Sequence, residues 1–140
     1  MIKDMKDIDK YLDDKVKKGY VYFVYSNIKK MIYVGETTST DRIEIYKSFV
    51  EKKDGPGKIS SYNYYTKTNT INYELAGDLV NSKNEFKVLH FETKYNKHLE
   101  KTYIRFLIEN GYNLYNSRIY KSHKYDLKEI DIDLIQNFIK

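Results

Sequence analysis

The sequence contains no cysteine and no tryptophan, and it has a single proline. Without cysteine the chain cannot form disulfides, thiolate zinc sites or a thiol nucleophile. Any bound metal must therefore be held by oxygen ligands or by the three histidines. His90, His98 and His123 lack the spacing of a metal-binding pair, so oxygen ligands are favoured.

Long apolar runs are also missing. The longest are of strand length and fall far short of the roughly 20 residues that cross a bilayer. Residues 1–18 alternate charged and apolar side chains, unlike the apolar centre of a signal peptide. We therefore expect a cytoplasmic protein with no membrane segment.

The composition is that of a folded globular protein, because 41% of the 140 residues are hydrophobic and 32% are charged. This length fits one domain, 1–140, and we find no repeat or linker that would divide it. The net charge of +5 permits attraction to a polyanion such as nucleic acid.

A β-hairpin is the clearest local prediction. Residues 20–26 (YVYFVYS) form an unbroken β-branched and aromatic run, which is typical of a strand buried on both faces. A polar turn at 27–30 leads to a second run at 31–35 (MIYVG). The two runs therefore pair as neighbouring strands.

Helical spacing and capping signals predict most of the remaining elements. A third strand is expected at 86–91, and a mobile, tyrosine-rich loop at 58–70. Helices are expected at 2–18, 42–52, 71–80, 97–110 and 126–139.

Two charged residues lie on the apolar faces of predicted helices. Glu100 shares a helix face with Ile104, Leu107 and Ile108, whereas Glu109 falls on the opposite, solvated face. Arg42 likewise shares a face with Ile45, Tyr46, Phe49 and Val50. A charge turned inward costs several kcal/mol unless it is paired or binds an ion.

Two explanations remain open for these charges. In the first, the charges have only a structural role. Glu100 and Arg42 then form an ion pair with each other, or their long side chains escape to solvent at the helix ends. Alternatively, they line a cleft in which the carboxylate holds a divalent cation and the guanidinium holds phosphate. Both residue types suit phosphodiester cleavage.

The order of motifs resembles the GIY-YIG nuclease family. Tyr20-Val21-Tyr22 stands in the first motif and Tyr33-Val34-Gly35 in the second, with ten residues between Tyr22 and Tyr33. Arg42 on the next helix, Glu100 on a later helix and Tyr112-Asn113 after that helix follow in family order. The resemblance covers about residues 20–116 and leaves flanking helices at 1–18 and 126–140. It implies an α/β (α+β) fold with a small, three-stranded, mostly antiparallel sheet flanked by helices.

The resemblance also implies an activity, namely hydrolysis of DNA phosphodiesters to 5′-phosphate and 3′-hydroxyl ends. Glu100 would be the sole protein ligand of Mg²⁺, for which Mn²⁺ substitutes, and Arg42 would bind the scissile phosphate. Tyr22 would orient or deprotonate the attacking water, and Tyr33 would assist it. Gly35 would leave space for the backbone to approach the substrate. Asn113 would brace the site, with Asn116 as a competing candidate for that role.

Two positions depart from the family pattern. Tyr20 stands where the family often has a glycine, and Tyr46 stands where many members have a histidine one turn after the arginine. A tyrosine there resembles the small phage endonuclease II group. Contacts to DNA are expected from Lys58, Tyr62, Tyr64 and Asn116. One active site cuts one strand, so double-strand cleavage needs a homodimer or sequential nicking, and the terminal helices offer dimer surfaces. Host-DNA degradation by phage, restriction, homing and repair are all consistent with this activity.

Two other functions remain open. Asp78, Glu92 and Lys94 together match the pattern of a PD-(D/E)xK nuclease. A basic nucleic-acid-binding module could also share the fold and lack the chemistry.

Overall fold

The computed structural model describes residues 18–51, 73–82 and 85–140. The helix predicted at 2–18 lies outside this range except for Lys18. The loop predicted at 58–70 also lies outside it, together with Lys58, Tyr62 and Tyr64.

The sheet is built around the predicted hairpin. Strands β1 (Gly19–Ser26) and β2 (Met31–Thr37) pair antiparallel, with Tyr22 opposite Gly35. Strand β3 (Phe86–Thr93) pairs antiparallel with the other side of β1. A strand not predicted, β4 (Asn113–Leu114), runs parallel to β2 and completes the order β3-β1-β2-β4. The predicted α/β class is confirmed, with a two-residue strand added to the expected three.

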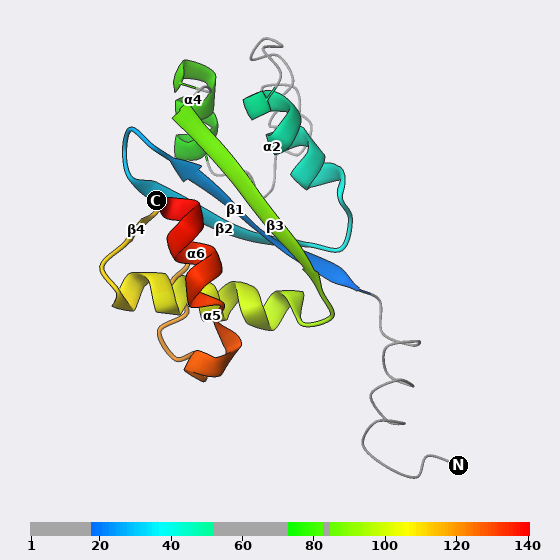
Figure 1. The fold of residues 1–140 in the computed structure, drawn as a ribbon, viewed down its shortest axis with the longest axis vertical. Coiled ribbons are helices and arrows are strands. Elements are labelled where there is room, and N and C mark those ends of the chain that lie inside the picture. The colour runs from blue at the N-terminus through cyan, green and yellow to red at the C-terminus, as the bar shows by residue number, and fades with distance from the viewer. Residues whose placement is uncertain (1–17, 52–72, 83–84) are drawn as a thin grey trace.

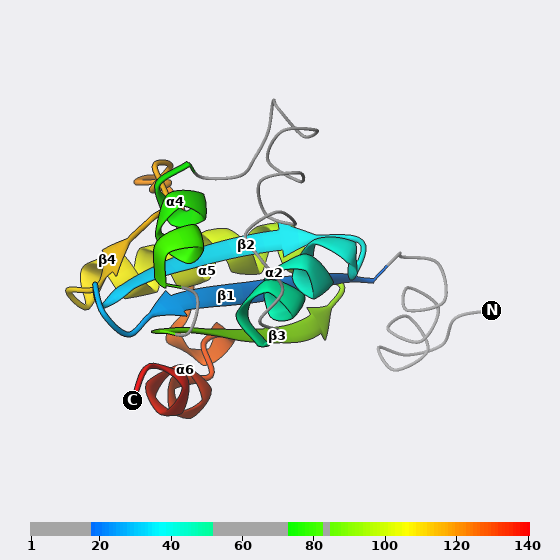
Figure 2. The same cartoon turned by 90° about the horizontal axis from the view of Figure 1, so that it is seen from above.

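Helices cover both faces of this sheet. Helices α2 (Asp41–Glu51) and α4 (Tyr73–Ser82) lie on one face, and α5 (Asn96–Glu109) lies on the other. Figure 2 shows α2 and α4 in front of the sheet and α5 behind it. Helix α6 (Ile132–Ile139) packs on the α5 side, next to β1 and β3 (Figure 1).

Strand β1 supplies side chains to both cores. Tyr22 and Val24 belong to the core beneath α2 and α4, whereas Val21, Phe23 and Tyr25 belong to the core against α5 and α6. All five side chains are buried, as predicted for a strand covered on both faces. Alternation along the strand therefore decides which side chains can meet on each face.

The chain after α5 differs from the single helix predicted at 126–139. A short 3₁₀ helix, η2 (Leu127–Glu129), precedes α6, and extended residues separate the two. Asp126 caps η2 and Asp131 caps α6, each by accepting a backbone hydrogen bond with its side chain. An aspartate favours such a cap over a helix interior, so Asp131 starts a new helix. No helix in the described part of the chain is long and apolar enough to cross a membrane.

Candidate active site

Three tyrosines gather beneath α2, as their spacing in the motifs predicts. The Tyr22 ring centroid lies 6.1 Å from that of Tyr33 and 5.7 Å from that of Tyr46. Tyr22 and Tyr46 are buried, and Tyr33 is half-buried. We call these three residues, with Arg42 of α2, the tyrosine cluster.

Gly35 is required by the packing of Tyr22 across the hairpin. A Cβ atom at Gly35 would lie 2.5 Å from the Tyr22 hydroxyl oxygen and in still closer contact with its ring. Any side chain at this position would force the ring out of its place. The glycine of the second motif therefore makes room for the tyrosine of the first.

The Tyr22 hydroxyl is the one buried side-chain polar atom without a hydrogen-bond partner of normal geometry among the described residues. Burial, with smaller contributions from Tyr33 and Tyr46, raises the pKa of Tyr22 well above its usual value, although nearby Arg42 opposes this shift. Tyr22 is therefore protonated at neutral pH. A neutral phenol can donate a hydrogen bond, but it cannot take a proton from water.

This orphaned hydroxyl predicts an unusual response to mutation. Tyr22→Phe should raise the free energy of unfolding by about 1 kcal/mol, because an unsatisfied buried hydroxyl costs roughly 1–3 kcal/mol. Tyr103→Phe is the matched control, because the Tyr103 hydroxyl accepts a 3.0 Å hydrogen bond from the backbone N–H of Asp131. That variant should lose about 1 kcal/mol. Urea unfolding measures both, and an equal loss in the two variants would contradict the assignment.

Glu100 of α5 belongs to a second group of polar residues, on the other face of the sheet. Its neighbours Ile104 and Leu107 on the same helix face are buried, and Glu100 itself is half-buried, as predicted. Burial, and then the negative charge of Glu36, raise the pKa of Glu100 to about 7. Glu36, which directly follows the second motif, was not predicted as a site residue.

Glu36 is held in place by the start of α5. The buried Asn96 side chain donates a hydrogen bond of 2.5 Å to Glu36 Oε2. Asn96 in turn packs over Gly19, where a Cβ atom would lie 2.5 Å from the Asn96 side chain. We call Glu36, Asn96 and Glu100 the carboxylate cluster. Its geometry depends on a glycine at the beginning of β1.

The two clusters lie on opposite faces of β2. Tyr33 and Gly35 point toward α2, whereas Val34 and Glu36 point toward α5, because successive strand residues alternate. Arg42 lies close enough to Tyr22 to lower its pKa, but it is not among the charges that shift the pKa of Glu100. The proposed ion pair between Glu100 and Arg42 is therefore not formed.

Asn116, rather than Asn113, contacts the second motif within β2. The Asn116 side-chain oxygen accepts a 2.9 Å hydrogen bond from the Val34 N–H, and its amide donates one of 2.8 Å to the Val34 carbonyl. Asn113 is exposed on β4 and pairs with Met31 at the other end of β2. The geometry thus favours Asn116 for the bracing role that we had expected of Asn113.

The carboxylate cluster fits a hard divalent cation. Burial and the negative charge of Glu36 oppose ionisation of Glu100, and a cation placed beside the Glu100 carboxylate would counteract both effects. No group of three histidine, aspartate or glutamate side chains suited to a metal occurs within residues 18–51, 73–82 and 85–140. Mg²⁺ is compatible with this small ligand set, because it commonly binds through one or two carboxylates and keeps several waters.

The alternative nuclease motif is not assembled. Asp78 lies at the hairpin-turn end of the sheet, where it pairs with Lys29 at 2.8 Å. Glu92 lies opposite Tyr20 at the other end, paired with Lys18 at 3.7 Å. Six residues of β1 separate the two ends, or roughly 20 Å at about 3.3 Å per residue. The structure therefore does not place Asp78 and Glu92 around one metal.

Two histidines that are far apart in sequence meet beside α5. The rings of His98 and His123 lie 4.8 Å apart, and His98 Nε2 lies 3.0 Å from Glu129 Oε1. Thr102 Oγ1 lies 2.9 Å from His123 Nε2. Sequence spacing could not reveal this pair, because 24 residues separate the two positions.

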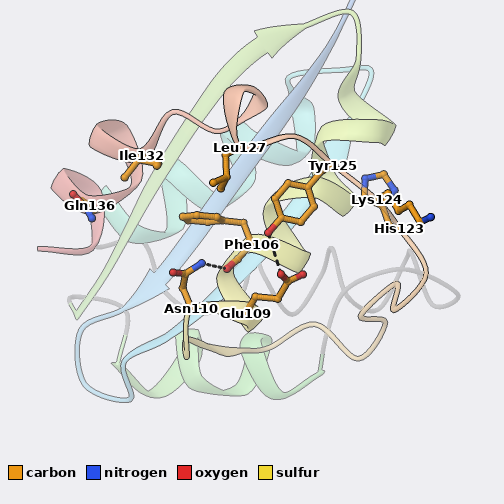
Figure 3. A pocket seen from close by; sticks show the side chains of 9 residues that line it. All are labelled: Phe106, Glu109, Asn110, His123, Lys124, Tyr125, Leu127, Ile132 and Gln136. Atoms are coloured by element: carbon orange, nitrogen blue, oxygen red, sulfur yellow. Dashed lines mark hydrogen bonds between the residues drawn. The ribbon is translucent and has the colours of Figure 1, made fainter.

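A groove next to these histidines runs between the end of α5 and the C-terminal segment (Figure 3). Tyr125 and Glu109 are joined across it by a 3.3 Å hydrogen bond. None of the predicted site residues lines it. Its lining consists of Phe106, Glu109, Asn110, His123, Lys124, Tyr125, Leu127, Ile132 and Gln136.

Comparisons with known proteins leave the family open. No family model matches the chain, and neither curated proteins nor solved structures give a significant match.

Proposed function

We propose that this protein is a metal-dependent DNA endonuclease that hydrolyses phosphodiesters to 5′-phosphate and 3′-hydroxyl ends. The observation that carries the proposal is the half-buried carboxylate pair of Glu100 and Glu36 at the end of the motif strand. The tyrosine cluster adds an arginine and hydroxyl groups at the same strand end. The motif order on these elements supports DNA as the substrate.

Glu100 and Glu36 would hold the cation, with Mg²⁺ or Mn²⁺ as the expected ion. A divalent cation there would stabilise the negative charge that develops on the phosphate and on the leaving oxygen. Arg42 donates hydrogen bonds to the phosphate from a planar guanidinium, which matches two phosphate oxygens. Asn96 fixes the Glu36 carboxylate in place.

The tyrosines differ in their access to the attacking water. Tyr33 is half-buried and lies nearer the surface, so its hydroxyl orients the water for in-line attack. Tyr22 packs behind it, remains protonated and supports the Tyr33 ring. This difference in burial supports an orienting role for the second motif and a supporting role for the first.

Plasmid cleavage tests the proposal. The purified chain should convert supercoiled plasmid to nicked or linear DNA in Mg²⁺ or Mn²⁺ and should be inactive in EDTA. Products should carry 5′-phosphates, which a ligase can seal without prior phosphorylation. A chain that is folded but leaves the plasmid supercoiled at every metal concentration would sink the proposal.

A binding module without catalysis is the second candidate, and the full burial of the Tyr22 hydroxyl favours it. Such a module would bind DNA in a salt-sensitive manner and leave it intact in Mg²⁺ and Mn²⁺.

The Glu92→Gln variant tests the other nuclease motif. It should cleave at the wild-type rate if Glu92 is not a metal ligand. Sedimentation with and without DNA would show whether two protomers assemble for double-strand cleavage.

A further inference from the structure

A cationic surface beside Glu100 is not explained by the chemistry above. Tyr120 lies on the segment after β4, and its hydroxyl is 3.5 Å from Glu100 Oε1, at the long end of the hydrogen-bonding range. Lys101 Nζ lies 5.2 Å from the centre of the Tyr120 ring, and the Arg118 guanidinium carbon lies 5.6 Å from it. Both distances fit cation–π contacts.

Residues 116–120, which carry Arg118 and Tyr120, are fixed at three points. Asn116 binds the backbone of Val34, Arg105 donates a 3.3 Å hydrogen bond to the Ile119 carbonyl, and Tyr120 reaches Glu100. The segment therefore joins the edge of the motif strand to the helix that holds the catalytic carboxylate.

Tyr120 adopts a backbone conformation that a bulky residue seldom takes. Its φ is +50°, in the left-handed region, which costs of order 1–2 kcal/mol for a residue with a Cβ atom. Such strain persists where surrounding contacts hold it, and it gathers at binding and catalytic sites.

Both cations lie near enough to Glu100 to oppose the rise in its pKa, but no described carboxylate holds either one in an ion pair. Arg118 is exposed and Lys101 is half-buried. Two positive groups held on one ring, next to the proposed cleavage site, suit the negatively charged phosphates of a DNA strand.

We propose that Arg118 and Lys101, arranged around Tyr120, each bind a backbone phosphate next to the scissile one. Tyr120 is a positioning residue, because its ring holds the two cations and its hydroxyl reaches Glu100. This inference rests on the proposed DNA substrate.

The test measures DNA binding by the full chain in EDTA, where no cleavage is expected. Anisotropy of a labelled duplex gives Kd across a salt series. Arg118→Gln and Lys101→Gln should each weaken binding about fivefold to tenfold and reduce the slope of log Kd against log salt by about 1. The double variant should reduce the slope by about 2.

Lys87→Gln is the matched control. Lys87 also lies over aromatic rings, 5.6 Å from the centres of both Tyr25 and Phe138, but at the hairpin-turn end of the sheet. Its substitution should leave Kd and the salt slope unchanged. Tyr120→Phe, which keeps the ring, should bind as the wild type does, whereas Tyr120→Ala should bind as Arg118→Gln does.

The outcomes separate the two proposals. If the wild type neither binds nor cuts DNA, the proposed function fails and this inference fails with it. If the wild type binds and cuts while Arg118→Gln and Lys101→Gln keep its salt slope, only the phosphate site is disproved. An equal loss in Lys87→Gln would show a nonspecific charge effect and also overturn it.

Discussion

Glu100→Gln should reduce plasmid cleavage by two to three orders of magnitude while leaving the protein folded. The amide keeps the size of the side chain but loses the charge that holds a cation. Removing one group that stabilises transition-state charge costs on the order of 3–4 kcal/mol in the barrier. Single-turnover cleavage of a labelled duplex measures the change.

Glu109→Gln is the matched control on the same helix. Glu109 is exposed on the opposite face of α5 and pairs with Arg105 at 3.3 Å, so its loss should leave cleavage unchanged. Wild-type cleavage by Glu100→Gln, with normal thermal stability, would show that Glu100 is not a catalytic residue.

Glu36→Gln should raise the Mg²⁺ concentration needed for half-maximal cleavage.

Stability should depend on pH through the same carboxylate. The folded-state pKa of Glu100, about 7, lies above the usual glutamate pKa of 4.5, so ionisation is opposed in the folded protein. Its contribution to stability is fully present below pH 4.5 and is lost as pH rises through 7. In EDTA, Tm should therefore fall between these limits in the wild type more than in Glu100→Gln. Parallel curves would contradict the shift, and added Mg²⁺ should restore the wild-type Tm at pH 8.

Arg42→Gln should lower cleavage about 100-fold to 1,000-fold, because the guanidinium is the only cation assigned to the tyrosine cluster. Arg42→Lys should recover little of this loss, since an ammonium cannot match two phosphate oxygens at once. Single-turnover cleavage under saturating enzyme separates this loss in the cleavage rate from weaker DNA binding.

Lys47→Gln provides the comparison on the same helix with the same change in charge. Lys47 belongs to α2 but has no role in the proposed site, so its variant should cleave as the wild type does. Equal losses in Arg42→Gln and Lys47→Gln would mean that α2 contributes general positive charge instead of a specific phosphate contact.

Much of the fold could be predicted from the sequence, because local patterns determine it. The apolar runs of β1 and β2 with a polar turn between them specified the hairpin, and the helical stripe through Ile104 and Leu107 specified α5. The division of the last helix was missed, because the aspartate cap at its second start resembles any solvated charge on a helix.

The site was harder to predict, because it depends on contacts between distant segments. Glu36 could have been found from strand alternation, which places it on the same buried face as Ile32 and Val34. Arg118 and Tyr120 carry no such signal, because only the fold brings their segment against α5. Helix periodicity correctly predicted that Glu100 and Arg42 point inward, but it could not reveal that they face opposite sides of β2.

The side-chain amide of Asn116 also affects how the protein behaves in solution. Beyond its short pairing with β4, the outer edge of β2 would offer the backbone groups of Val34 to any passing strand. The amide satisfies both of those groups, as a neighbouring strand would. The same residue that braces the motif strand therefore also protects this edge against intermolecular strand pairing and aggregation.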